Sequence, residues 1–289
     1  MTRRYKSKRT VWTVDGNGTR RRKDLLATEE PLQIELRAGG EQRTAAITMR
    51  TPGNDYDLAA GFLYAEDIIR SHHEIANMRY CVDGEQDQQQ YNLLAVTLRR
   101  EQLPELVQLE RYFFINSACG VCGKTMLDDL GERELPPLAD RATLVTPELL
   151  HPLPEKLRDA QRIFAETGGL HAAALFDLDG NLLAVREDVG RHNALDKLIG
   201  WGLRNKQLPF SDKIIMVSGR ASYELLHKCR IAGAPIFCAV SAPSSLAAEL
   251  ADQFGITLVG FLREDRFNIY THPARIGQLA LMPSRAVSG

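Results

Sequence analysis

The sequence predicts an α/β protein in which a small α+β part precedes a three-layer α/β/α domain with a mixed sheet. Between residues 172 and 262, short apolar runs alternate with stretches of helical spacing, a pattern typical of strands and helices packed in layers. Before residue 130, alternating strand patterns surround one helical stretch. A segment rich in Pro, Glu and Asp separates the two regions and has the composition of a linker.

These boundaries divide the chain into four parts. They are a basic flexible arm at 1–24, a small α+β domain at 25–130, a linker at 131–146 and the three-layer domain at 147–289.

The first part of the chain shows strand and helix spacing in a clear order. The double glycine at 39–40 predicts a hairpin turn, and apolar residues recur at helical spacing from Leu58 to Ile69. The expected elements are strands at 31–37 and 44–49, a helix at 54–69, and strands at 78–82 and 92–98.

The second part alternates strands and helices after a first helix. Asp179-Gly180-Asn181 predicts a hairpin turn between the first two strands. The expected elements are helix 147–166, strands 172–178 and 182–186, helix 190–203, strand 213–217, helix 220–232, strand 235–241, helix 244–254 and strand 257–262.

Composition is that of a soluble globular protein, with 44% hydrophobic and 25% charged residues among 289. No apolar run approaches the roughly 18 residues of a membrane helix, and the N-terminus lacks the apolar core of a signal peptide. Five cysteines, an odd number, do not form a disulfide framework. We therefore expect a cytoplasmic protein with no membrane association.

Charge is unevenly spread along the chain. Residues 1–23 hold nine Lys or Arg and one acid, a net charge of +8, which leaves −9 for the remainder of a chain whose total is −1. A basic arm can bind nucleic acid or an acidic partner. We favour a solvated, partly disordered tail and expect no nucleic-acid partner.

Two thiols, Cys119 and Cys122, form a Cys-x-x-Cys pair flanked by glycines. An apolar run at 112–115 predicts a strand that leads into this loop. Three chemistries remain open: half of a structural zinc site, a thioredoxin-like redox pair, or a thiol that carries a persulfide. Each needs a thiolate, and the cation of Lys124 would lower a thiol pKa. The structural alternative is two small loop residues. The remaining thiols, in apolar patterns, are predicted to be inert core residues: Cys81, Cys229 and Cys238.

Polar clusters follow the strands of the second part, at 187–192, 218–222, 241–245 and 263–266. Ligands of α/β sheets bind at such strand ends, and helix N-termini there favour anions. Together the clusters predict a large phosphorylated ligand, although each alone fits an ordinary cap or turn. The chain has neither a P-loop nor a dinucleotide fingerprint. The candidate contact residues are His171, Arg191, His192, Ser218, Arg220 and Ser222.

The strand–strand–helix–strand–helix order of the second part resembles that of cytidine deaminases. Those enzymes place a zinc-binding His or Cys, a Glu and a Cys-x-x-Cys at two helix starts. The corresponding positions here, 192–194 and 218–222, lack the Glu and both thiols, so we expect a deaminase-like scaffold without zinc. A weaker alternative combines His72-His73-Glu74 with the pair Cys119 and Cys122 as a deaminase zinc site.

With these motifs in view, the chain resembles the FdhD family of sulfur carrier proteins required for formate dehydrogenase activity. The resemblance runs in the family's order from about residue 30 to residue 275. The segments that carry it are Cys119–Gly123, Gly169–Ala174, Glu187–Leu198, Ser218–Glu224, Ala239–Ala242, Leu258–Phe261 and Tyr270–Pro273.

The resemblance implies a sulfurtransferase with a cysteine persulfide intermediate. A cysteine desulfurase would load sulfur onto Cys119, with Cys122 assisting or resolving. The sulfur would then pass to the molybdenum of bis-molybdopterin guanine dinucleotide, a bound substrate, before this cofactor enters formate dehydrogenase. The resemblance further implies a homodimer. A second hypothesis is a non-catalytic module that only binds the molybdenum cofactor.

The resemblance also assigns cofactor contact to one stretch after the last predicted strand. Its residues are Phe261, Leu262, Arg263, Glu264, Asp265 and Arg266. Glu264 and Asp265 stand where the family pattern has small or basic residues, whereas Arg263 and Arg266 fit phosphate contact.

Overall fold

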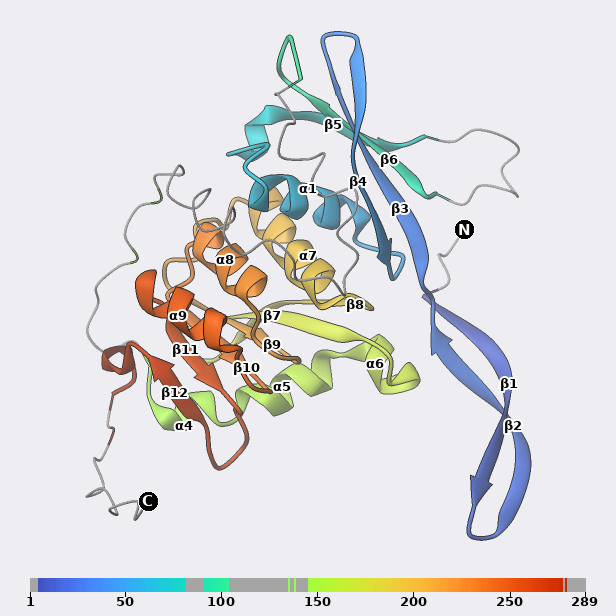
Figure 1. The fold of residues 1–289 in the computed structure, drawn as a ribbon, viewed down its shortest axis with the longest axis vertical. Helices are drawn as coiled ribbons and strands as arrows, with labels where there is room; N and C mark the ends of the chain where they lie inside the picture. Colours follow the sequence, from blue (N-terminus) through green and yellow to red (C-terminus); the bar gives the residue numbers. More distant parts are fainter. Residues whose placement is uncertain are drawn as a thin grey trace.

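The structure is a computed structural model that describes residues 5–81, 91–103, 135, 138, 145–277 and 279. Within these residues, the chain forms a two-stranded hairpin, a four-stranded sheet and a six-stranded sheet (Figure 1). The predicted Cys-x-x-Cys loop with Cys119 and Cys122, the strand predicted at 112–115 and most of the predicted linker lie outside the described residues.

The four-stranded sheet and helix α1 make up the first part of the chain. The strands lie in the order β4-β3-β6-β5, with β3 and β6 parallel and the two outer pairs antiparallel. The elements are β3 (Glu30–Ala38), β4 (Glu41–Arg50), α1 (Asp55–Ala65), the 3-10 helix η1 (His72–Glu74), β5 (Ile75–Tyr80) and β6 (Leu93–Leu98). The predicted hairpin and the two later strands are confirmed.

Helix α1 is shorter than its apolar spacing predicts. The spacing extends to residue 69, whereas the helix ends at Ala65. Asp67 has a φ of 55°, through which a right-handed helix does not continue. The N–H groups of Ile68 and Ile69 donate to the carbonyl of Leu63, and both isoleucines are buried. The apolar pattern therefore continues from the helix into a buried turn.

The six-stranded sheet is mixed, as predicted. Strands lie in the order β12-β11-β10-β9-β7-β8, and β9, β10 and β11 are parallel to one another. The elements are α4 (Pro147–Leu150), α5 (Leu153–Ala160), α6 (Arg162–Thr167), β7 (His171–Asp177), β8 (Leu182–Asp188), α7 (Arg191–Arg204), β9 (Lys213–Val217), α8 (Tyr223–Ala232), β10 (Ile236–Ala239), α9 (Ser245–Gln253), β11 (Thr257–Gly260), β12 (Asn268–Thr271) and the 3-10 helix η3 (Pro273–Arg275).

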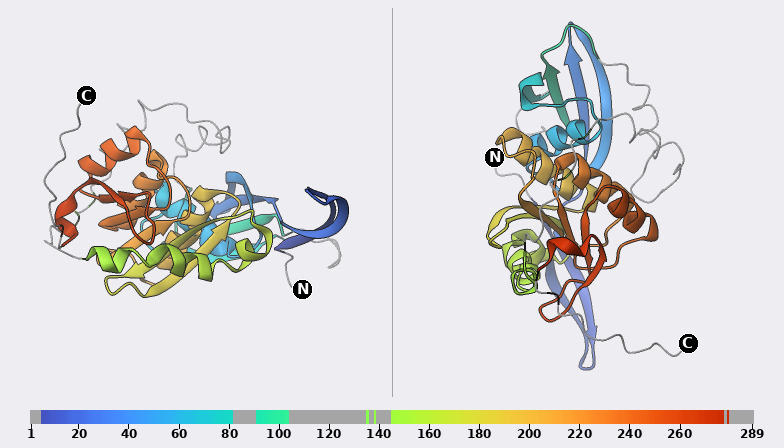
Figure 2. Two further views of the ribbon diagram at one scale, coloured as in Figure 1. Left: turned by 90° about the horizontal axis from the view of Figure 1, so that it is seen from below. Right: turned by 90° about the vertical axis from the view of Figure 1, so that its left-hand side faces the viewer.

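Helices cover both faces of this sheet (Figure 2). Along β7, side chains alternate between the faces, as strand geometry requires. Ala173 and Leu175 join the core formed with α7, α8 and α9, whereas Ala172, Ala174 and Phe176 pack with the leucines of α4 and α5. The predicted three-layer α/β/α arrangement is thereby confirmed.

Two features of this part differ from the prediction. The single helix expected at 147–166 is three short helices, because Pro152 and Pro154 lack N–H donors and Gln161 has a ψ of 77°. Strand β12 is not predicted by the sequence pattern. Its four residues form an antiparallel edge strand beside β11, with Asn268 and Tyr270 exposed, Ile269 half-buried and Thr271 buried.

The two parts of the chain pack against each other through α1 and α7. A Cβ on Gly61 would lie 1.8 Å from the carbonyl oxygen of Asp196, and one on Gly200 would lie 1.8 Å from that of Asp57. The helices therefore touch backbone to backbone. One buried core extends from β3 and α1 to α7, α8 and β11, so the expected domain boundaries do not separate two independent cores.

The basic arm has regular structure, and the prediction of a partly disordered tail at 1–24 is wrong for residues 6–24. This segment forms an antiparallel hairpin of β1 (Lys6–Asp15) and β2 (Gly18–Ala27) that projects from the body (Figure 1). Charge dominates the sequence pattern here, although the run from Thr10 to Val14 consists of good strand formers.

None of the described helices is long and apolar enough to cross a membrane.

Candidate functional site

The predicted polar clusters meet at one edge of the six-stranded sheet. Because β7 runs antiparallel to β9, the start of β7 lies beside the carboxyl end of β9. The Ala172 N–H donates to Ser218 Oγ over 2.9 Å, and the Ser218 N–H donates to the Ala172 carbonyl over 3.0 Å. These bonds fix Ser218 next to His171. The ends of β10 and β11 reach the same edge, where α/β sheets commonly bind ligands.

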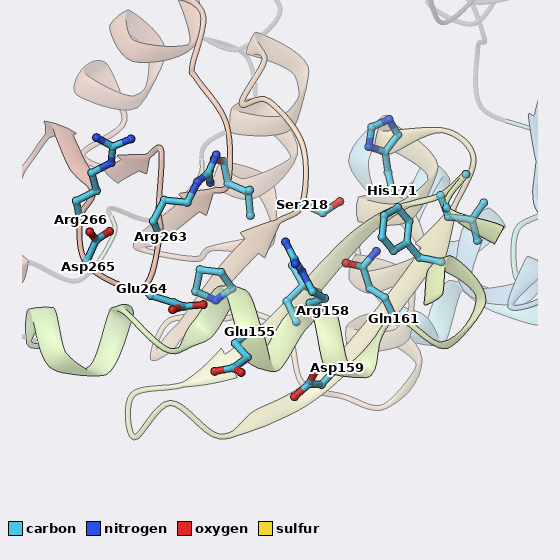
Figure 3. Close-up of a pocket in the computed structure, with 17 residues that line it drawn as sticks. Glu155, Arg158, Asp159, Gln161, His171, Ser218, Arg263, Glu264, Asp265 and Arg266 are labelled. Atoms are coloured by element: carbon cyan, nitrogen blue, oxygen red, sulfur yellow. The ribbon is translucent and has the colours of Figure 1, made fainter. Parts of the chain in front are cut away.

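A cavity of about 1130 Å³ opens at this edge, large enough for a cofactor-sized ligand (Figure 3). Its wall comes from α5, α6, the Gly168–Gly169 turn, and the residues that follow β9, β10 and β11. Six residues that the sequence assigns to the ligand line it: His171, Ser218, Arg263, Glu264, Asp265 and Arg266.

The cavity wall carries charges of both signs. Beside Arg263 and Arg266, helix α5 contributes Arg158 together with the acids Glu155 and Asp159. In Figure 3, Arg158 points toward Ser218, whereas the carboxylates of Glu155 and Asp159 point to the other side of α5. The cations are therefore better placed than these two acids to meet a ligand at the sheet edge.

Arg263 is held in place by backbone carbonyls. Its guanidinium donates to the carbonyls of Val240 and Leu262, and its N–H donates to the Arg266 carbonyl over 2.9 Å. These bonds anchor the turn that carries Glu264 and Asp265 to the end of β10. The acids themselves are exposed on this turn.

Phe261 and Leu262 do not line the cavity. Phe261 is 40% exposed and has a φ of 52°. Leu262 is completely buried among the residues that pack between the sheet and α5, so its side chain does not face the cavity, although the family resemblance implies that it contacts the cofactor. The carbonyl of Leu262 contributes by accepting from Arg263 instead.

His171 lies half-buried at the cavity wall. Burial, together with the positive charges of Arg191 and His192, lowers the pKa of His171 below its ordinary 6.5. The ring is therefore neutral at pH 7 in the free protein. A Cβ on Gly219 would lie 3.3 Å from Nδ1 of His171, so Gly219 leaves room for the ring.

A second polar group lies where α7 and α8 begin, and it does not line the cavity. His192 Nε2 is 3.5 Å from both Ser222 Oγ and a carboxylate oxygen of Glu224. The hydrogen bond from His192 lowers the pKa of Glu224 to about 2. Four of the predicted contact residues therefore form a set adjacent to His171: Arg191, His192, Arg220 and Ser222. The charges of Arg191, His192 and Arg220 all lower the pKa of His171.

The two acids that precede this group are structural. Glu187 accepts from the N–H groups of Ile163 and Phe164 at the start of α6. Asp188 is fully buried and pairs with Lys197 over 2.6 Å while accepting from the Thr51 N–H. These contacts tie β8 to α6, α7 and β4, and they leave the later residues of the cluster for a ligand.

Sequence reasoning missed the part of the cavity wall formed by α5 and α6. Arg158, Gln161 and Phe164 line it at helical spacing. Gln161 is 4% exposed, and its Nε2 has no hydrogen-bond partner among the described residues. Helical spacing gives a signal that these residues share a face, but it does not show that this face borders a cavity.

Metal-ligand clusters are absent from the described residues, where no group of three or more His, Cys, Asp or Glu is placed to hold an ion. Glu74 of the alternative zinc motif accepts from the N–H groups of Arg70 and Ser71 and pairs with Arg100. The thiols at 119 and 122 that would complete this motif lie outside the described residues, and the absence of zinc stays a prediction.

The core positions of Cys229 and Cys238 are confirmed. Both are fully buried, and burial raises the pKa of Cys238 to about 12 and that of Cys229 further. Cys81 is only half-buried and accepts from Arg37 Nη2 over 3.3 Å. The two buried thiols are therefore unavailable as thiolates at neutral pH.

A family model and related proteins match nearly the whole chain. A family model described as the FdhD/NarQ family matches residues 27–277. A protein named sulfur carrier protein FdhD, from Mycolicibacterium paratuberculosis, is 49% identical over 273 residues, covering 94% of this chain and 98% of the relative. A protein of the same name from Sulfolobus acidocaldarius is 45% identical over 253 residues, covering 88% of this chain and 91% of the relative.

The fold also matches a solved structure. The crystal structure of a protein from Desulfotalea psychrophila, described as a candidate formate dehydrogenase accessory protein, aligns with a TM-score of 0.71 and 24% sequence identity. The alignment covers 94% of this chain and 99% of that one, so the two share their fold along their length.

Proposed function

The chain belongs to the FdhD/NarQ family, and from this premise we propose that it is a sulfur carrier that serves a formate dehydrogenase. The observation that carries the proposal is the cavity at the sheet edge. It gathers His171, Ser218, Arg263 and Arg266, four residues that the sequence pattern and the family resemblance assign to ligand contact. A sulfur carrier that also binds the acceptor of its sulfur needs two features: the Cys pair to carry the sulfur and a cavity to bind the acceptor.

Sulfur enters as a persulfide on Cys119. The Cys119 thiolate attacks the terminal sulfur of a persulfide on a cysteine desulfurase, which forms Cys119–S–SH and releases the desulfurase thiol. One S–S bond forms as another breaks, so the exchange needs no external oxidant or reductant. The reaction needs a thiolate at Cys119, and this requirement fits a reactive thiol with a cation nearby, such as Lys124.

Cys122 resolves the persulfide in the second step. Its thiolate attacks Sγ of Cys119, the terminal sulfur leaves as hydrosulfide, and the pair becomes a disulfide. Two electrons from the thiols leave with the sulfur, which reaches the molybdenum as sulfide. A dithiol reductant then restores both cysteines for the next cycle.

The molybdenum substrate is bis-molybdopterin guanine dinucleotide, held in the cavity. Its phosphates are anions, and the guanidinium groups of Arg158, Arg263 and Arg266 are suited to bind them. Neutral His171 gains a proton more readily once an anion is nearby, which would add a further favourable charge. Binding in the cavity would hold the cofactor until formate dehydrogenase receives it.

The proposal includes two further expectations from the family resemblance: a cysteine desulfurase and formate dehydrogenase are the protein partners, and the carrier is a homodimer. From the composition of the chain, we further expect it to work in the cytoplasm.

Intact-protein mass spectrometry tests the sulfur step. The protein is incubated with an active cysteine desulfurase and cysteine, and the adduct is mapped by peptide analysis. We expect one added sulfur on Cys119 that a thiol reductant removes, and no adduct on Cys119→Ala. Cys122→Ala should retain the adduct for longer, because resolution is blocked. If wild-type protein acquires no sulfur on either thiol, the sulfur-carrier mechanism is wrong.

A second candidate function is a chaperone that binds the molybdenum cofactor without carrying sulfur. The cavity favours it equally, since binding requires only the lining residues. Formate dehydrogenase activity in cells that produce the Cys119→Ala variant separates the two. Activity like that of wild type would support the chaperone, and loss of activity with the variant still folded would support the carrier.

A further inference from the structure

The basic hairpin β1–β2 projects from the body with most of its residues exposed (Figure 2). Trp12 is 67% exposed and Val14 is 74% exposed, unusual values for apolar side chains of this size. A two-stranded ribbon is only marginally stable in water by itself. Such a ribbon gains stability and buries its apolar side chains when a partner covers it.

The two faces of this hairpin differ in charge. Since the register has no bulge, residues directly opposite each other share a face. One face, here called the cationic face, includes no acid. Its residues are Lys6, Lys8, Thr10, Trp12, Val14, Thr19, Arg21, Lys23, Leu25 and Ala27. The Arg21 guanidinium lies 5.4 Å from the centre of the Trp12 ring, so cation and aromatic ring form one exposed surface.

On the opposite face, most of the positive charge is neutralised by ion pairs with aspartates of the hairpin. Arg20 pairs with Asp15 over 3.1 Å, and Arg22 pairs with Asp24 over 3.1 Å while donating to a neighbouring threonine. Both acids of the hairpin lie on this face. The excess positive charge of the hairpin is therefore concentrated on the cationic face.

The root of the cationic face adjoins the cavity. Lys6 pairs with Glu166 on α6. The Cβ of Ala27 lies 3.6 Å from the position of a Cβ on Gly169, and Gly169 itself lines the cavity. The cationic face thus starts at the cavity rim and continues outward along the ribbon. A protein that docks on it would stand at the cavity mouth.

We propose that the cationic face docks an acidic surface of the protein that receives the cavity's ligand, which under the proposed function is formate dehydrogenase. This inference rests on the proposed function for the identity of the partner. Charge complementarity favours an acidic protein surface. Pairing of two cationic faces from two copies would oppose like charges.

Two charge-matched variants test the proposal. Lys8→Glu with Lys23→Glu reverses two charges on the cationic face, and Arg9→Glu with Arg20→Glu reverses two on the opposite face. Binding of formate dehydrogenase purified without its molybdenum cofactor is measured by biolayer interferometry at low and at physiological salt. Hydrogen exchange over residues 6–27 checks that each variant retains the hairpin.

We expect the first variant to bind roughly tenfold or more weakly at low salt, and the second to bind nearly as wild type. Trp12→Ala should also weaken binding, with less dependence on salt. Sulfur loading of Cys119 by the desulfurase should be unchanged in all three, which separates this proposal from the carrier function. Three results would overturn it: equal loss in both charge variants, tighter binding of a cysteine desulfurase or RNA to the cationic face, or absence of binding by a wild-type protein that still loads sulfur.

Discussion

His171 is neutral at the cavity wall, so its protonation should respond to the charge of a ligand. Its pKa is lowered by burial and by the positive charges of Arg191 and His192. The folded protein therefore binds a proton there less readily than the unfolded chain does. This group therefore contributes stability above pH 6.5, and that contribution is lost as pH falls from 6.5 toward the lowered pKa of the folded protein.

We predict that proton NMR will place the pKa of His171 below 6.5 in the free protein. An anionic ligand in the cavity should raise it, and by linkage such a ligand should bind more tightly as pH falls through this range. Arg191→Gln should raise the pKa in the free protein, because one of the positive charges that lower it is removed. A free-protein pKa at or above 6.5 would contradict this electrostatic account.

Single residues also show how far sequence reasoning reaches. His171, Ser218 and Arg263 can be identified because they follow or begin strands whose ends meet at one sheet edge. Arg158 and Gln161 cannot, because a helix of mixed polarity does not reveal which face borders a cavity. That information is a property of how α5 and α6 pack, and it is absent from local spacing.

Elements with strong periodicity are predicted closely, and those with competing signals are not. Strand β9 has the bounds expected from its apolar run, 213–217, because it is buried on both faces. The helix expected at 147–166 is interrupted by prolines and by the backbone of Gln161. The β1–β2 hairpin is not predicted, because its many cationic residues suggest a solvated tail even though strand-forming residues lie between them.

The crossing of α1 and α7 depends on glycine at two positions. In Gly61→Ala, the new methyl group would lie 1.8 Å from the Asp196 carbonyl oxygen, and the backbones would have to separate. We predict a loss of about 2 kcal/mol or more in the free energy of unfolding, in the range of overpacked cores. Urea denaturation measures it. Gly16→Ala is the control, since a Cβ there meets nothing within 4 Å. A loss in Gly61→Ala no larger than in the control would mean that the helices are not in backbone contact.

On the scale of the whole molecule, a buried ion pair joins the two parts of the chain through its hydrogen bonds to Thr51. Lys197 of α7 donates to the Thr51 carbonyl over 2.9 Å and pairs with Asp188 at the end of β8. Asp188 in turn accepts from the Thr51 N–H. The segment after β4 is thus held by the same two charges that fix the start of α7. The chain should therefore unfold as one cooperative unit over the described parts.

Breaking this network should destabilise the whole molecule. Lys197→Met leaves the Asp188 carboxylate buried without its cation, which typically costs about 3–5 kcal/mol. We predict that urea denaturation, followed by fluorescence and by circular dichroism, will show one transition at lower urea for the variant. Lys197→Met combined with Asp188→Asn should recover part of the loss, because the buried charge is also removed. Two separate transitions in the wild-type protein would show that the parts fold independently.

The cavity is assembled from three regions far apart in sequence, so its chemistry depends on the complete fold. Arg158 comes from α5, whereas Ser218 follows β9 and Arg263 follows β11.

Guanosine diphosphate carries the guanine and phosphate groups of the proposed cofactor and serves as a probe of the cavity. We predict that Arg158→Glu weakens its binding about tenfold or more, since a hydrogen bond to a charged group contributes about 1.5–3 kcal/mol. Isothermal titration calorimetry measures the affinity, and Arg162→Glu, an exposed residue of α6 outside the lining, makes the same charge change as a control. Equal weakening in both variants would mean that the long-range field attracts the nucleotide, and that Arg158 does not contact it in the cavity.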